Sequence, residues 1–202
     1  MMSIAVLFAR SDSNYKTIQG CDVWDKDRDA TRWSGGVPVI AHPPCRGWGQ
    51  LRKLANPAPG EKELALFAVD QVRRYGGVLE HPVASTLWPV AGLPEPGERD
   101  QYGGWTLVIS QRWWGHRAEK LTRLYIVGVE PGGVPDIPIT LGEAECICGS
   151  SGRRRDGSRL RKGDPGWRPE ITKAEREHTP PALAEWLVEL AKQCTTNKQQ
   201  CA

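Results

Sequence analysis

Five short apolar runs, rich in residues that favour β-structure, constrain the fold of this chain more than any other feature. They are residues 3–8, 37–41, 78–80, 105–110 and 123–129. Each run is too short for an ordinary helix, and turn residues or polar stretches separate the runs. Short continuous apolar runs are typical of strands buried in a sheet that is covered on both faces. The runs therefore predict a β-sheet at the centre of the fold.

Residues 60–77 have the periodicity of an amphipathic helix instead. Their apolar residues recur three or four positions apart, and Gly76 and Gly77 follow the last of them, as at a helix end. A second amphipathic helix is predicted near the C-terminus, capped by Thr179 and with Pro180 in its first turn. Strands that alternate with helices predict an α/β fold.

The chain is expected to divide into four regions. Residues 1–130 form an α/β catalytic core, residues 131–170 a small irregular insert, residues 171–193 a helix that packs back on the core, and residues 194–202 a flexible tail. The insert contains the stretch 152–162, with six Arg or Lys residues against one Asp. Such a stretch is either a solvated surface loop or a segment that binds phosphate. Its basic residues are Arg153, Arg154, Arg155, Arg159, Arg161 and Lys162.

Bulk features exclude several classes of protein. No apolar run approaches the ~20 residues that a membrane helix needs, and the N-terminus lacks the basic region of a signal peptide. We therefore expect a cytoplasmic protein without a membrane partner. The six cysteines lack the spacing of a disulfide framework and are expected to be reduced. Cys146 and Cys148 lack a second well-spaced pair, so no metal site is expected.

Reactive residues follow or precede three of the predicted strands. Cys45 comes after the strand 37–41 in the sequence AHPPCRGWG, Glu80 ends the strand 78–80, and the basic residues Arg117, Lys120 and Arg123 lead into the last strand. Ligands of α/β sheets gather outside the carboxyl ends of the strands, so Cys45 and Glu80 can converge if their strands are parallel neighbours. A thiolate, a carboxyl group and a cation together suit nucleophilic catalysis. The alternatives are a packed cysteine, a solvated acid and a surface cation.

The order and spacing of these groups resemble the DNA cytosine-C5 methyltransferases. The stretch PPCRGWG (43–49) is similar to their Pro-Cys motif, and Glu80-His81-Pro82 falls at their Glu-Asn-Val motif. The stretch HRAEKLTRLYIVG (116–128) is similar to their Gln-x-Arg-x-Arg motif, and TPPALAEWLVELA (179–191) to their final motif. The interval from 45 to 80 is 35 residues and that from 80 to 123 is 43 residues, close to the family's own.

The resemblance implies a fold and a chemistry. The fold would be a truncated, Rossmann-like methyltransferase sheet, of the compact kind found in phage enzymes, acting in a bacterial host cell. Cys45 would add to C6 of a cytosine flipped out of DNA, Glu80 would hold N3 and the exocyclic amine and assist as an acid, and Arg123 would contact O2. A nearby arginine (Arg46, Arg117 or Arg123) would stabilise the thiolate. The implied substrate-binding residues are Pro44, Arg46, Trp48, His81, Arg117 and Lys120.

The resemblance also implies S-adenosyl-L-methionine as the methyl donor. The implied cofactor-binding residues are Phe8, Asp22, Asp25, Pro43, Thr179 and Pro180. However, the stretch AVLFARSDSNYK (5–16) lacks both glycines of the family's cofactor loop. Two alternatives therefore stay open: modification of a pyrimidine in DNA or in a free nucleotide with another donor, and a non-catalytic DNA-binding descendant of the family. The small insert predicts short or lax sequence specificity dominated by phosphate contacts.

Overall fold

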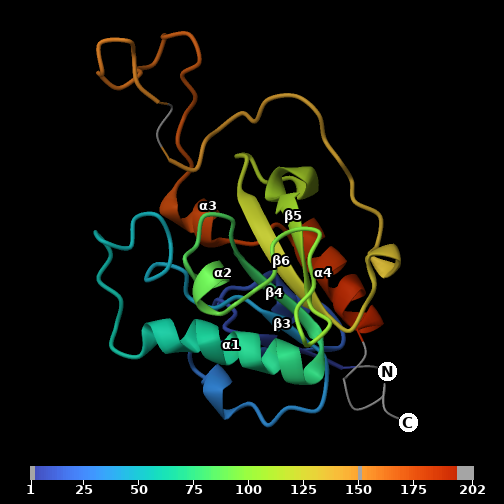
Figure 1. Ribbon diagram of the computed structural model, residues 1–202. Coiled ribbons are helices and arrows are strands. Elements are labelled where there is room, and N and C mark those ends of the chain that lie inside the picture. The colour runs from blue at the N-terminus through green and yellow to red at the C-terminus, as the bar shows by residue number, and fades with distance from the viewer. Residues whose placement is uncertain (1–2, 150–151, 195–202) are drawn as a thin grey trace.

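The computed structural model describes residues 3–149 and 152–194, and a mixed sheet lies at their centre (Figure 1). From one edge to the other, its six strands are β2 (Cys21–Trp24), β1 (Ile4–Leu7), β3 (Val39–Ala41), β4 (Gly77–Pro82), β6 (Leu121–Val127) and β5 (Trp105–Ser110). The first four are mutually parallel, whereas β6 is antiparallel to both of its neighbours. Consequently β1 to β5 all point their carboxyl ends toward the same edge of the sheet. The predicted α/β class is confirmed.

Each strand contributes alternate side chains to two hydrophobic layers. On one face Ile4, Val6 and Ile40 pack with the helix α4 (Pro181–Gln193). On the other face Ala5 and Leu7 pack with the helix α1 (Glu61–Tyr75). Successive side chains of a strand point to opposite faces of the sheet. A continuous apolar run therefore supplies apolar side chains to both hydrophobic layers. Figure 1 shows α1 and α4 on opposite sides of the sheet.

The connections between the first three strands are short 3-10 turns, whereas the sequence predicts helices that alternate with the strands. One 3-10 turn, η1 (Asn14–Thr17), joins β1 to β2, and another, η2 (Ala30–Arg32), joins β2 to β3. These segments lack the apolar periodicity that a helix needs to bury a face. The remaining short helices are α2 (Leu87–Val90), η3 (Gln111–Trp114), η4 (Pro131–Gly133) and α3 (Lys173–Glu177).

Two predicted boundaries are wrong. The last strand lies at 121–127 rather than 123–129, because its pairing with β4 and β5 begins at Leu121. The final helix begins at Pro181, with Pro180 as its N-cap, and no side chain caps it. Thr179 instead offers its backbone carbonyl to the side-chain amide of Asn14. A proline in the first turn leaves one fewer backbone N–H to be capped.

The strands β3 and β4 approach closely because Gly77 stands at the start of β4. Its φ is +119°, and a Cβ atom there would lie 2.0 Å from the carbonyl oxygen of Val39. Glycine alone accepts this conformation and this contact. The residue thereby sets the spacing of the two strands that carry the candidate site.

The region 131–170 contains little regular structure apart from η4. One isolated bridge joins Arg153 and Arg159, and Figure 1 shows this basic stretch projecting away from the sheet. Of the predicted C-terminal tail, Cys194 is buried, and residues 195–202 lie outside the described residues. All five cysteines in the described residues are free. Within the described ranges, no helix has the length and apolarity needed to cross a membrane.

Candidate functional site

The strand order reverses direction next to β1. The chain runs outward from β1 to β2 and then returns to the other side of β1 with β3. At such a switch point the loops after neighbouring strands diverge and leave a crevice outside the carboxyl ends. The expected adjacency of the Cys45 and Glu80 strands is confirmed, because β3 and β4 are parallel neighbours. Cys45 and Glu80 thus lie at the same edge of the sheet.

Glu80 stands at the centre of a buried polar network. Its Oε2 accepts a hydrogen bond from Nδ1 of His42 at 3.2 Å, and its Oε1 accepts one from Nε2 of Gln111 at 3.0 Å. The other ring nitrogen of His42 lies 3.0 Å from the hydroxyl of Tyr15. The Gln111 amide also donates to Oγ1 of Thr122 at 3.1 Å. The side chains of Glu80 and His42 remain 12% and 13% exposed, so the carboxylate is not completely sealed from solvent.

The network keeps Glu80 ionised. Burial by itself would raise the pKa of this carboxyl group, but the hydrogen bond from His42 and the positive charge of Lys120 outweigh that effect, and the pKa falls to about 2. A carboxylate in this state accepts hydrogen bonds and has no proton to donate. This differs from the implied role as an acid: in the free protein, Glu80 is a hydrogen-bond acceptor.

Cys45 is exposed, in the loop that follows β3. The backbone N–H groups of Trp48 and Gly49 both donate to its carbonyl, at 3.0 and 2.8 Å, so a turn fixes its backbone. Protein atoms around the thiol raise its pKa, the negative charge of Glu80 raises it further, and Lys120 opposes them. At neutral pH the free protein therefore holds a thiol rather than a thiolate.

The arginines expected to stabilise a thiolate are engaged elsewhere. Arg46 forms an ion pair with Glu61, and Arg117 binds Glu175 at 2.8 Å and donates to the sulfur of Cys146 at 3.2 Å. Neither arginine offsets the burial and the charge of Glu80 that raise the pKa of Cys45.

Arg123 lies on the wrong face of the sheet to meet Glu80. It is paired in register with His81, whereas Glu80 is paired with Leu124, and residues opposite one another in a sheet share a face. The Arg123 guanidinium binds Glu95 at 2.9 Å and lies 5.5 Å from the ring of Trp88.

Lys120 is the cation whose charge acts on both Glu80 and Cys45. Its charge lowers the pKa of both Glu80 and Cys45, and its side chain is half-buried. Within the described ranges, no hydrogen bond or ion pair of its ammonium group is found. Of the predicted site residues, Cys45, Glu80 and Lys120 thus influence one another through their charges, whereas Arg117 and Arg123 are held by other acids.

The other predicted residues of this region, for binding the substrate (His81, Trp48, Pro44) or the cofactor (Pro43), are buried or half-buried. His81 is fully buried and packs edge-on against Trp88, with ring centroids 6.5 Å apart. Trp48 is also buried, and its indole N–H donates to the carbonyl of Lys62. Pro43 is buried and Pro44 half-buried in the loop that leads to Cys45.

Both acids predicted to bind the cofactor are held by cations of this chain. Asp22 accepts a hydrogen bond from Arg28 at 2.6 Å, and Asp25 binds Lys16 at 2.6 Å. At the end of β1, Phe8 adopts a positive φ of 61° and packs edge-on against Phe67. A bulky residue in that conformation is strained.

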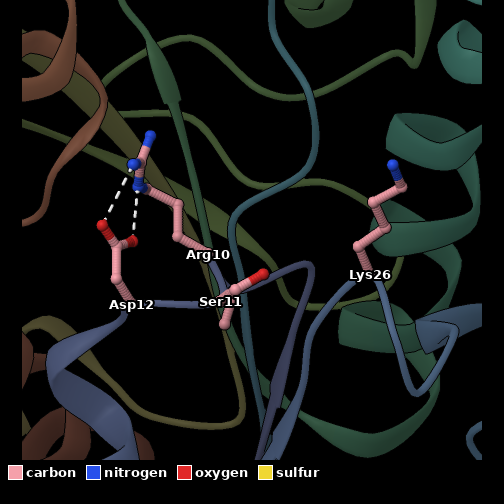
Figure 2. Close-up of a pocket in the computed structure, with 5 residues that line it drawn as sticks. Arg10, Ser11, Asp12 and Lys26 are labelled. Atoms are coloured by element: carbon pink, nitrogen blue, oxygen red, sulfur yellow. Dashed lines mark hydrogen bonds and ion pairs between the residues drawn. The ribbon is translucent and has the colours of Figure 1, made fainter.

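An open pocket lies beyond the end of β1, lined by Ala9, Arg10, Ser11, Asp12 and Lys26. Figure 2 shows Arg10 turned toward Asp12, with Lys26 on the far side of the pocket. Arg10 also binds Glu177 at 2.7 Å, and Asp12 lies 3.0 Å from Nε2 of His178. Ion pairs therefore occupy the place of the glycine loop, and the acids nearby are already paired. These residues do not match the S-adenosylmethionine site that the resemblance implies.

The basic residues of the insert fall into two groups. Arg153 donates to the carbonyl of Gly157, and Arg154 binds Asp164 at 2.7 Å. The remaining four are exposed and, among the described residues, form no ion pair: Arg155, Arg159, Arg161 and Lys162.

The three residues that hold Glu80, directly or through His42, were not predicted. His42 and Gln111 directly follow β3 and β5, and both strands end at the same edge as β4. The rule that selected Cys45 would have selected them as well. Tyr15 lies in a 3-10 turn and carries no comparable signal. Comparison of the chain with protein-family models, curated proteins and solved structures gave no match.

Proposed function

We propose that this protein modifies cytosine in DNA at C5, through a covalent bond between the sulfur of Cys45 and C6 of the base. One observation carries the proposal: an exposed cysteine after β3 lies at the same sheet edge as an ionised carboxylate on the adjacent parallel strand β4. Addition of the thiolate at C6 makes C5 nucleophilic, and C5 then takes a group from an electrophilic donor, which releases its leaving group. Loss of the C5 proton with expulsion of the thiolate restores the double bond and completes the substitution.

The state of Glu80 supports cytosine as the base. Each carboxylate oxygen accepts one hydrogen bond from the protein and retains a further lone pair. The exocyclic amine of cytosine is a donor that can use one of these lone pairs. N3 of the neutral base is an acceptor, and it becomes a second donor when it takes a proton from solvent, which the negative charge of Glu80 favours. Uracil and thymine present a carbonyl oxygen at the position of the amine, and two facing acceptors disfavour binding.

Substrate binding also favours the thiolate. The charge of Glu80 is one of the causes that raise the pKa of Cys45, and a positively charged N3–H bound to Glu80 offsets that charge. Lys120 then remains as the cation beside both groups. We assign to Lys120, rather than Arg123, the contact with the base carbonyl.

The basic stretch of the insert supports DNA as the substrate. C5 and C6 of a stacked base are out of reach of a side chain in the required geometry, so the base must be extruded. The four exposed basic residues of the insert supply phosphate contacts, which position a duplex without reading its sequence.

The parallel half of the sheet, with its switch point beside β1, supports a Rossmann-like fold of the methyltransferase type. The electrophile that C5 attacks is not assigned, because the residues near the pocket after β1 are paired with one another. Incubation with and without S-adenosylmethionine distinguishes a methyl donor from another donor.

The test is covalent trapping on duplex DNA that contains 5-fluorocytosine, where the fluorine blocks the elimination step. Wild type should yield a band that resists denaturation, and Cys45→Ser should yield none. Cys21→Ser is the matched control, because Cys21 lies at the opposite, amino end of its strand. Nucleoside mass spectrometry of co-expressed DNA gives the mass added to cytosine. A Cys45→Ser variant with full activity would disprove the proposal, and DNA binding without any adduct would indicate a non-catalytic DNA-binding protein.

A further inference from the structure

The donors around Glu80 come from three distant parts of the chain. His42 follows β3, Gln111 follows β5, and Tyr15 lies in the turn after β1. Their hydrogen bonds all have lengths between 3.0 and 3.2 Å. The two oxygens of the carboxylate are thus held from two sides, and its plane is fixed.

Glu80 fixes the tautomer of His42, because an ionised carboxylate can only accept and Nδ1 must carry the hydrogen of that bond. Tyr15 is 1% exposed and burial raises the pKa of its hydroxyl well above 10, so this hydroxyl keeps its proton and can donate it to Nε2 of the neutral ring. Nε2 of His42 is then the acceptor, and Nδ1 carries the hydrogen that binds Glu80. Because Tyr15 is sealed from solvent, the chain of hydrogen bonds ends there. The arrangement serves to orient Glu80 and not to conduct protons.

Gln111 is oriented at a cost. Its Nε2 serves both Glu80 and Thr122, while its buried Oε1 has no hydrogen-bond partner in the described structure. The reverse orientation of the amide would place Oε1 against the carboxylate. An unsatisfied buried oxygen is unfavourable, so its presence indicates that the donor to Glu80 is required.

We propose that Tyr15, His42 and Gln111 are positioning residues that hold the Glu80 carboxylate in one orientation with its free lone pairs available to the base. This inference rests on the proposed function for its consequence in catalysis. The hold on the carboxylate itself is tested without DNA. None of the three side chains is assigned a contact with the base.

The experiment follows the Glu80 carboxyl group by ¹³C NMR as a function of pH, with the signal assigned by Glu80→Gln. The variants are His42→Leu, Gln111→Met and Tyr15→Phe, which remove donors with little change of shape. His42→Asn is the conservative variant, since its amide nitrogen can replace Nδ1. Thr106→Val is the matched control: it removes another buried hydroxyl, which binds the carbonyl of Pro94, on the opposite face of the sheet.

Wild-type Glu80 should remain ionised at every pH at which the protein is folded. In His42→Leu and Gln111→Met, its titration midpoint should rise by about one pH unit or more. Tyr15→Phe should give a smaller rise, and both His42→Asn and the control should stay near wild type. The pH below which the rate of DNA trapping falls should rise together with the titration midpoint of Glu80.

Unchanged midpoints in Gln111→Met and in His42→Leu would overturn the inference. If His42→Leu does not fold, the comparison of Gln111→Met and Tyr15→Phe with the control decides. Shifted midpoints in a protein that forms no adduct with DNA would reject the proposed function and retain the positioning network. An adduct with unshifted midpoints would retain the proposed function and reject the positioning network.

Discussion

Replacement of His81 by phenylalanine tests whether this residue is structural or binds substrate. The ring is fully buried against Trp88, and neither nitrogen makes a hydrogen bond of normal geometry in the described structure. Burial lowers the pKa of His81 to about 4, while the charge of Glu80 and the backbone of Pro44 oppose this effect. The folded protein therefore holds His81 neutral.

The sign of the pH dependence follows from the two states. The pKa of the ring is 6.5 in the absence of the fold and about 4 within it. As the pH falls below 6.5, the unfolded chain binds a proton that the folded chain does not, so the stability of wild type decreases. At ~1.4 kcal/mol per pH unit the full loss is about 3 kcal/mol, of which about 2 kcal/mol is reached at pH 5.

The assay is urea unfolding at pH 8 and pH 5, followed by tryptophan fluorescence. Phenylalanine fills the same space beside Trp88 and does not titrate. The free energy of unfolding of His81→Phe should therefore fall by about 2 kcal/mol less than that of wild type between the two pH values. All other titrating groups are common to both proteins. Equal losses in the two proteins would refute the reasoning and show that His81 is accessible to solvent.

Two further predictions concern the cation of the site and the insert. In Lys120→Gln, the cation that lowers the pKa of Cys45 is lost. The pH midpoint of Cys45 alkylation, followed by peptide mass spectrometry, should therefore rise by up to ~0.5 pH unit. An unchanged midpoint would remove Lys120 from the site. The double variant Arg155→Gln/Arg159→Gln loses two phosphate contacts. The slope of log affinity for DNA against log salt concentration, measured by fluorescence anisotropy, should therefore decrease in magnitude by about 2, one for each lost contact. An unchanged slope would mean that the insert does not touch DNA.

Much of the fold was predictable because its signals are local. Short apolar runs marked five of the six strands, and the periodicity of residues 60–77 marked α1. The strand β2 carries no such signal, because its residues are half-buried at an edge of the sheet. The helix boundary at Pro181 was missed by one residue.

The candidate site was predictable only in part. Cys45 and Glu80 each follow from position in the sequence, since each stands near the end of a predicted strand. Arg123 was an equally reasonable choice by spacing, but spacing does not say which face of a sheet a residue occupies. That property depends on the register of β6 against β4, and a shift of one residue reverses it.

The sequence by itself determined the secondary-structure elements and the two reactive groups, because apolar periodicity and turn residues act over a few neighbouring residues. The tertiary structure alone decided which groups meet. The antiparallel insertion of β6 between β4 and β5 turned Arg123 away and brought Gln111 to Glu80. The turn after β1 placed Tyr15 behind His42. Such contacts join residues up to 38 positions apart, and only the packing of the strands fixes their distances.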